Sequence, residues 1–139
     1  MSHHTIKIRR LQWLFEMSKE KRDYASERDA MRSYLAQQKD YINKNVRTSG
    51  DGYAEETKGL DLMRIGKDKE ALVQFFIAID KKFDAPALYR EAAVLLEKYE
   101  MFDEALYVID RGLKNIPTVN RHRDELLKRR DQIKEKMGK

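Results

Sequence analysis

The chain has 139 residues, the size of one domain, of which 41% are hydrophobic and 38% are charged. With a mean hydropathy of −0.81, this composition excludes a largely membrane-embedded chain, and it differs from that of a disordered one. The absence of cysteine excludes disulfides and thiolate metal sites and favours a cytoplasmic protein. The net charge of +5 alone does not indicate a nucleic-acid partner, because acidic residues are interspersed among the basic ones at helical spacing.

Helix-breaking residues are scarce. Only 6 glycines and 2 prolines occur, so long tracts of good helix formers predict an all-α fold. No apolar run reaches the roughly 18 residues that a membrane-spanning helix requires. The start MSHHTIKIRR lacks the apolar stretch of a secretory leader, and we therefore expect neither a signal peptide nor a membrane span.

Residues 4–47 contain no glycine or proline and can form one long helix, or two helices broken near the polar run KEKRD. The stretch RTSGDGY then supplies turn residues and predicts a linker. Residues 1–48 are therefore expected to form a helical segment that packs on the rest of the chain or dimerises beside it. Two stripes at helical spacing support this: Ile8, Leu11, Leu14 and Phe15, then Tyr24, Met31, Tyr34, Leu35, Gln38, Tyr41 and Ile42.

Residues 53–117 match themselves after a shift of thirty-four residues, with small residues falling on small ones and large on large. Two antiparallel helices can cross closely only where a small side chain lets the backbones approach, so the small positions predict crossing points. Pro117 should end the last of these helices, because proline disfavours a helical residue before it. The matched pairs are Gly59 with Ala93, Leu62 with Leu96, Ala71 with Ala105, Leu72 with Leu106, Phe75 with Ile109, and Ala78 with Gly112.

This pattern resembles the tetratricopeptide repeat (TPR) family, whose repeat is thirty-four residues long. Residues 86–119 match well, with Tyr89 at an aromatic position and FDEAL from Phe102 at the turn into the second helix. Residues 52–85 match less well, because Glu55, Lys58 and Phe83 stand where Trp, Leu and Pro are expected.

The resemblance implies an all-α, TPR-like α-solenoid of two helical hairpins in residues 53–117. About three repeats are normally needed to bury a continuous core, so other helices must complete it. Residues 118–139, with an apolar stripe, are expected to form a C-terminal capping helix, and residues 1–48 a long helix or helix pair at the other end. The stripe consists of Leu126, Leu127, Ile133 and Met137.

No residue set supports catalysis. The sequence lacks a cysteine nucleophile, a glycine-rich phosphate loop and the common hydrolase and metalloprotease motifs, so we expect no enzyme and no cofactor. His3, His4 and His122 are the only histidines, and their separation argues against a metal site. Arg9, Arg10 and Trp13 resemble a membrane-surface anchor, but the apolar stretch is short and packing of Trp13 in the core is preferred.

The resemblance also implies a concave groove, lined by the first helix of each repeat, that binds a peptide or a partner helix. An acidic C-terminal tail is not expected, because Glu56 and Leu60 stand where the family's tail-binding clamp has Lys and Asn. Apolar residues flanked by cations suit an amphipathic helix with an acidic rim, although the chain's own N-terminal helix could also lie there. The groove positions are Glu56, Leu60, Met63, Arg64, Arg90, Glu91, Val94, Glu97 and Lys98.

The sequence therefore predicts a non-catalytic adaptor with a protein or peptide partner, and two alternatives stay open. The first is a self-assembling module that dimerises through the stripe of Tyr34, Leu35, Tyr41 and Ile42. The second is a nucleic-acid or ribosome-associated factor that uses the basic C-terminal helix, which lacks aromatic residues for base stacking. The arginines in question are Arg121, Arg123, Arg129 and Arg130.

Overall fold

The computed structural model describes residues 24–117 and 121–138, and all regular secondary structure in these ranges is helical, which confirms the expected all-α class. The first stripe of the N-terminal segment, Trp13, His3 and His4 lie outside the described residues. The helices are α2 (Tyr24–Gln37), α3 (Lys39–Val46), α4 (Tyr53–Arg64), α5 (Asp68–Asp80), α6 (Pro86–Lys98), α7 (Phe102–Asn115) and α8 (Arg121–Lys136).

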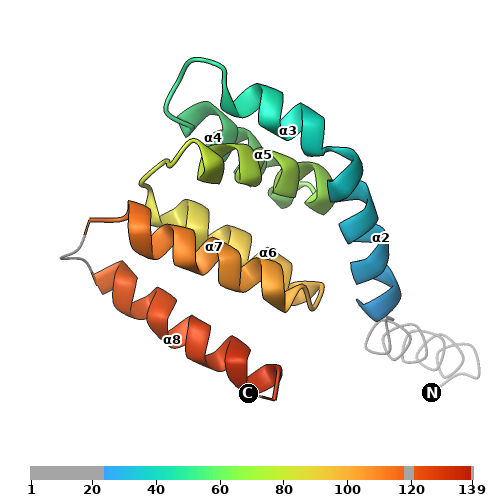
Figure 1. Cartoon of the computed structure of the whole chain (residues 1–139), viewed down its shortest axis with the longest axis vertical. Coiled ribbons are helices and arrows are strands. Elements are labelled where there is room, and N and C mark those ends of the chain that lie inside the picture. Colours follow the sequence, from blue (N-terminus) through green and yellow to red (C-terminus); the bar gives the residue numbers. More distant parts are fainter. Residues whose placement is uncertain (1–23, 118–120, 139) are drawn as a thin grey trace, which may run out of the picture.

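The helices α4 and α5 form one antiparallel hairpin and α6 and α7 form a second, with α5 packed against α6 between them (Figure 1). At one end of this stack α3 lies along α5 and α2 crosses beside it, while α8 packs on α7 at the other end. The core runs through the whole assembly, from Met31 of α2 through both hairpins to Ile133 of α8. The flanking helices thus complete the core that two hairpins alone would leave open.

In the N-terminal segment, the described part consists of two helices that meet at Gln38. The break near KEKRD that the sequence suggested would lie outside the described residues, and the break at Gln38 was not anticipated. Ile42 is buried against Val73 and Ile77 of α5, and Leu35 packs beside it. Much of the stripe considered for pairing two chains is therefore covered by α5 of the same chain.

Close helix approach occurs at the two glycines where the sequence predicted it. A Cβ added at Gly59 would lie 2.6 Å from the ring of Phe75 and 3.3 Å from the carbonyl oxygen of Ala71. A Cβ at Gly112 would lie 2.9 Å from Cγ of Tyr89 and 2.9 Å from Cδ1 of Leu126. Neither position has room for a side chain. Because glycine has no Cβ atom, α4 can lie close to α5, and α7 can lie close to both α6 and α8.

The turns inside the two hairpins have the same backbone conformation thirty-four residues apart. Lys67 and Met101, which precede α5 and α7, both have φ −89° and ψ 67°. The amide of Lys67 donates to the carbonyl oxygen of Leu62 at 2.9 Å, and that of Met101 donates to Leu96 at 2.9 Å. The sequence period is therefore also a period of the backbone.

Each of these turns contains a residue with positive φ, but only the first uses glycine. Gly66 has φ 80°, whereas the equivalent position of the second hairpin is Glu100 with φ 56°. A side chain in the left-handed region costs about 1–2 kcal/mol, so the second turn carries a strain that the first avoids.

The helices α5 and α7 end differently. Ile116 is extended, with ψ 139°, because Pro117 follows it, and α7 ends at Asn115 as expected. The position after α5 that is equivalent to Pro117 is Phe83, and α5 ends instead with Lys82 in the left-handed conformation at φ 66°, where the amide of Phe83 donates to the carbonyl oxygen of Ala78.

The linker between α3 and α4 is held by a buried lysine. The side chain of Lys81 is only 3% exposed, and its ammonium group contacts Thr48 Oγ1 at 3.0 Å, the carbonyl oxygen of Ser49 at 3.1 Å and Glu55 Oε1 at 3.0 Å. Three acceptors offset the cost of burying this charge and fix the linker on the end of α5.

The repeated turn gives a matched pair of stability predictions. Replacing Gly66 by Ala should lower the free energy of unfolding by about 1 kcal/mol, because nothing surrounds this position and backbone strain is the whole effect. Glu100→Gly should raise it by about 0.5–1 kcal/mol, since relief of strain exceeds the added entropy of the unfolded chain. Urea denaturation measures both, and changes of the same sign would contradict equivalence of the two turns.

A second prediction concerns Gly112. Gly112→Ala gains about 1 kcal/mol of helix propensity, but the added methyl group clashes with Tyr89 and Leu126, and overpacking costs about 1–3 kcal/mol. We expect net destabilisation of about 1 kcal/mol in urea denaturation. Lys114→Ala, at an exposed position of the same helix, should change stability little, and a stabilising Gly112→Ala would refute the close contact.

Candidate functional site

The open part of the expected groove lies on α6. Val94 is 42% exposed, which makes it one of the few large apolar side chains at the surface. Arg90 lies one helical turn earlier on the same face, half-exposed, with its Nε 3.5 Å from Oε1 of Glu91. An apolar side chain next to a weakly paired guanidinium group is a surface that can receive an apolar residue beside an acidic one.

The helix α8 forms the other wall of a cavity of about 250 Å³ next to this surface. It is fixed to α6 by Arg129, whose Nη1 donates to Oε2 of Glu97 at 2.6 Å, and Lys136 approaches the other oxygen at 3.7 Å. Within the described chain Lys128 makes no ion pair, so its charge is available in the cavity. The lining residues are Pro86, Arg90, His122, Glu125, Leu126, Lys128, Arg129 and Gln132.

The groove positions of α4 lie differently from those of α6. Leu60 and Met63 are partly buried and pack against the core. Arg64 is exposed, with its Nη1 3.2 Å from Oδ1 of the neighbouring Asp61. On α4, therefore, Arg64 is available at the surface, whereas Leu60 and Met63 are part of the core packing.

Glu56, which was expected on the groove surface, is only 7% exposed. Its Oε2 atom is fully buried and has no hydrogen-bond partner among the described residues. Burial raises the pKa of the Glu56 carboxyl group above its ordinary value, because removing the charged form from water costs free energy. This carboxylate is therefore a source of instability at neutral pH and not a surface ligand.

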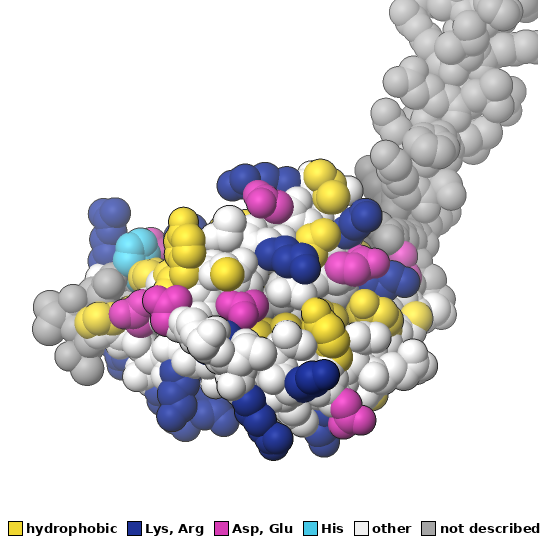
Figure 2. All heavy atoms as spheres, turned by 90° about the horizontal axis from the view of Figure 1, so that it is seen from above, with side chains coloured by type: hydrophobic (Ala, Val, Ile, Leu, Met, Phe, Trp, Pro, Cys, Tyr) yellow, Lys and Arg dark blue, Asp and Glu magenta, His cyan; other side chains and the backbone are white. Residues whose placement is uncertain are grey.

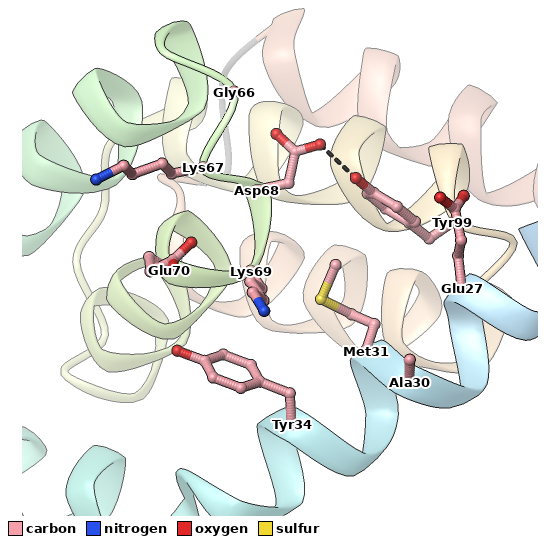
Figure 3. A pocket seen from close by; sticks show the side chains of 10 residues that line it. All are labelled: Glu27, Ala30, Met31, Tyr34, Gly66, Lys67, Asp68, Lys69, Glu70 and Tyr99. Atoms are coloured by element: carbon pink, nitrogen blue, oxygen red, sulfur yellow. Dashed lines mark hydrogen bonds between the residues drawn. The ribbon is translucent and has the colours of Figure 1, made fainter. Parts of the chain in front are cut away.

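A larger cavity of about 430 Å³ lies between α2 and the start of α5, with Asp68 and Tyr99 in its lining (Figure 3). Lys98 contacts one of these lining residues. Its Nζ donates to Oδ2 of the buried Asp68 at 2.9 Å, and the hydroxyl group of Tyr99 donates to the same oxygen at 2.5 Å. On the α2 side, Tyr34 lies beneath Lys69, whose Nζ is 5.2 Å from the ring centre. The bonds to Asp68 join the start of α5 to the end of α6, so Lys98 has a structural partner.

The chemistry of the described residues is that of ion pairs and apolar contacts. No group of three or more His, Cys, Asp or Glu side chains that could hold a metal ion occurs among them. No helix in the described ranges is long and apolar enough to cross a bilayer. On the face shown in Figure 2, which looks down on the α3 end of the molecule, basic and acidic side chains are interleaved and the hydrophobic patches are small.

Of the nine positions carried over from the resemblance, only Arg90 lines the cavity between α6 and α8, and Glu97 holds α8 in place. The α8 residues of this cavity were not predicted from the sequence to bind a peptide. A second shift of thirty-four residues would have found three of them, because Glu125 corresponds to Glu91, Lys128 to Val94 and Gln132 to Lys98. The site is thus built from α6 and α8 more than from α4 and α6.

No protein-family model matches this chain, and comparisons with curated proteins and with solved structures give no match.

Glu56 yields a pH-dependent prediction. The pKa of the Glu56 carboxyl group is higher in the folded protein than in the unfolded chain, so protonation of this group favours folding. This contribution to stability is complete at pH values below the unfolded pKa, and it is lost as the pH rises through the folded pKa. Glu56→Gln should therefore stabilise the protein by about 1 kcal/mol at pH 7, and the gain should shrink toward pH 4. Glu135→Gln at an exposed site of α8 is the control, and a loss of stability in Glu56→Gln at pH 7 would contradict the assignment.

Proposed function

We propose that this protein is a non-catalytic, TPR-like adaptor that binds a partner helix or peptide on the face formed by α6 and α8. The observation that carries the proposal is the pairing of exposed Val94 with half-exposed Arg90, next to a cavity walled by α8. The recurrence of the hairpin turn after thirty-four residues supports the TPR-like part of the proposal. Absence of cysteine favours a cytoplasmic setting for such an adaptor.

The chemistry of this face favours a particular class of partner. Arg90, Lys128 and Arg129 line the cavity against one carboxylate, Glu125, and Arg129 is already engaged by Glu97. Arg90 and Lys128 thus leave positive charge available on opposite walls. An amphipathic segment that places an apolar residue on Val94 and acidic residues toward the cavity complements this surface.

The proposal is tested with the tagged full-length chain in extracts of the source cell. The variant Arg90→Glu with Val94→Asp reverses the charge and polarity of the face at a half-exposed and an exposed position, and it should leave the circular dichroism spectrum and thermal unfolding nearly unchanged. Partners that bind here should be depleted about tenfold or more in quantitative mass spectrometry, because central contacts dominate binding energy.

The matched control is Lys114→Glu, a charge reversal at an exposed position of α7, which should retain the same partners. If every partner that copurifies with the wild-type protein stays bound to the doubly substituted protein, this face is not the binding site.

A further inference from the structure

A separate groove lies on the side of the molecule where α2 and α3 meet α5 and α7. It has a volume of about 330 Å³ and an apolar floor that includes Leu35, Ala36 and Phe76. Ala36 is exposed, and Leu35 and Phe76 are only partly buried. This groove shares no lining residue with the cavity between α6 and α8.

The two rims of the groove carry opposite charges. Arg32 and Lys39 stand on the rim formed by α2 and α3, and Asp80 and Glu104 stand on the rim formed by α5 and α7. At one end the rims are joined by Arg32 and Glu104, whose two nitrogen–oxygen distances are 2.7 and 2.8 Å. This bidentate pair closes that end of the groove within the chain.

At the other end the opposite charges remain apart. Lys39 is exposed and forms no ion pair with any residue in the described ranges. Asp80 accepts a hydrogen bond from the hydroxyl group of Tyr107 at 3.0 Å, and no cation of the described chain lies within ion-pair distance of it. Tyr107 is itself 39% exposed, so an aromatic side chain stands at the acidic rim.

A groove with one basic and one acidic rim is complementary to itself. When two molecules are related by a two-fold axis parallel to the groove, the basic rim of each molecule faces the acidic rim of the other, which gives two equivalent contacts. We propose that a second copy of this chain docks here, with Lys39 of each copy facing Asp80 of the other and Tyr107 covering the apolar floor. A basic or an acidic partner would match only one rim and would be repelled by the other.

The dimer is tested by sedimentation equilibrium of the full chain between about 1 µM and about 500 µM, a range that includes weak standard-sized interfaces. The wild-type protein should show a reversible monomer–dimer equilibrium. Ala36→Glu, which puts a carboxylate on the apolar floor at an exposed position, should weaken dimerisation about tenfold or more. Lys39→Glu should do the same by placing two carboxylates opposite each other.

The charge swap distinguishes this arrangement from other dimers. Lys39→Glu combined with Asp80→Lys should restore dimerisation to within about threefold of the wild-type dissociation constant, whereas Lys44→Glu, an exposed control on α3, should leave it unchanged. A wild-type chain that stays monomeric across the range overturns the proposal. So does a dimer that is insensitive to Ala36→Glu, or a double variant that fails to recover while remaining folded by circular dichroism.

Discussion

Close helix approach at two glycines is the constraint on which the rest of this structure depends. Gly59 allows α4 to lie against the Phe75 ring on α5, and Gly112 allows α7 to lie against Tyr89 on α6 and Leu126 on α8. If these helices moved apart by the width of a methyl group, large core side chains on both sides would lose their contacts. The surfaces formed by α6 and α8 are placed by helices held in this way.

Polar bonds complete the joints between the hairpins. Asp68 at the start of α5 accepts hydrogen bonds from Lys98 and Tyr99 at the end of α6. The hydroxyl group of Tyr89 donates to the carbonyl oxygen of Phe83 and accepts from Asn115 Nδ2 at 2.9 Å, which ties α6 to the preceding loop and to the end of α7. Apolar packing sets the spacing of the helices, and these bonds set their register, because a shift along the helix axis would leave buried polar groups without partners. The face on α6 is therefore presented on a rigid support.

Much of the fold could be predicted from the sequence because its signals are local and periodic. The scarcity of glycine and proline predicted helices, and the recurrence of small residues predicted where they cross, as Gly59 and Gly112 show. The break at Gln38 could not be predicted, since no proline or glycine marks it. The left-handed conformation of Glu100 could not be predicted from this residue itself. It can be inferred only because Glu100 occupies the position equivalent to Gly66 in the first hairpin.

The candidate site was less predictable than the fold because burial depends on tertiary neighbours. Helical spacing placed Glu56 and Arg90 at equivalent positions, yet Glu56 is buried and Arg90 is half-exposed. Lys98 looked like a free cation on the groove wall, but it is bonded to Asp68, thirty residues earlier. Sequence periodicity assigns a residue to a helix face, whereas the charges that remain available depend on which groups the fold brings beside them.

The most direct measurement is a nuclear Overhauser spectrum of the isotope-labelled chain at the two glycines. We expect strong cross-peaks from the α-protons of Gly59 to the ring of Phe75 and from those of Gly112 to the side chain of Tyr89, with the resonances of the Gly59 α-protons shifted by the ring current. A well-dispersed helical spectrum in which both sets of cross-peaks are missing would contradict the claim that these helices are held together at their smallest residues.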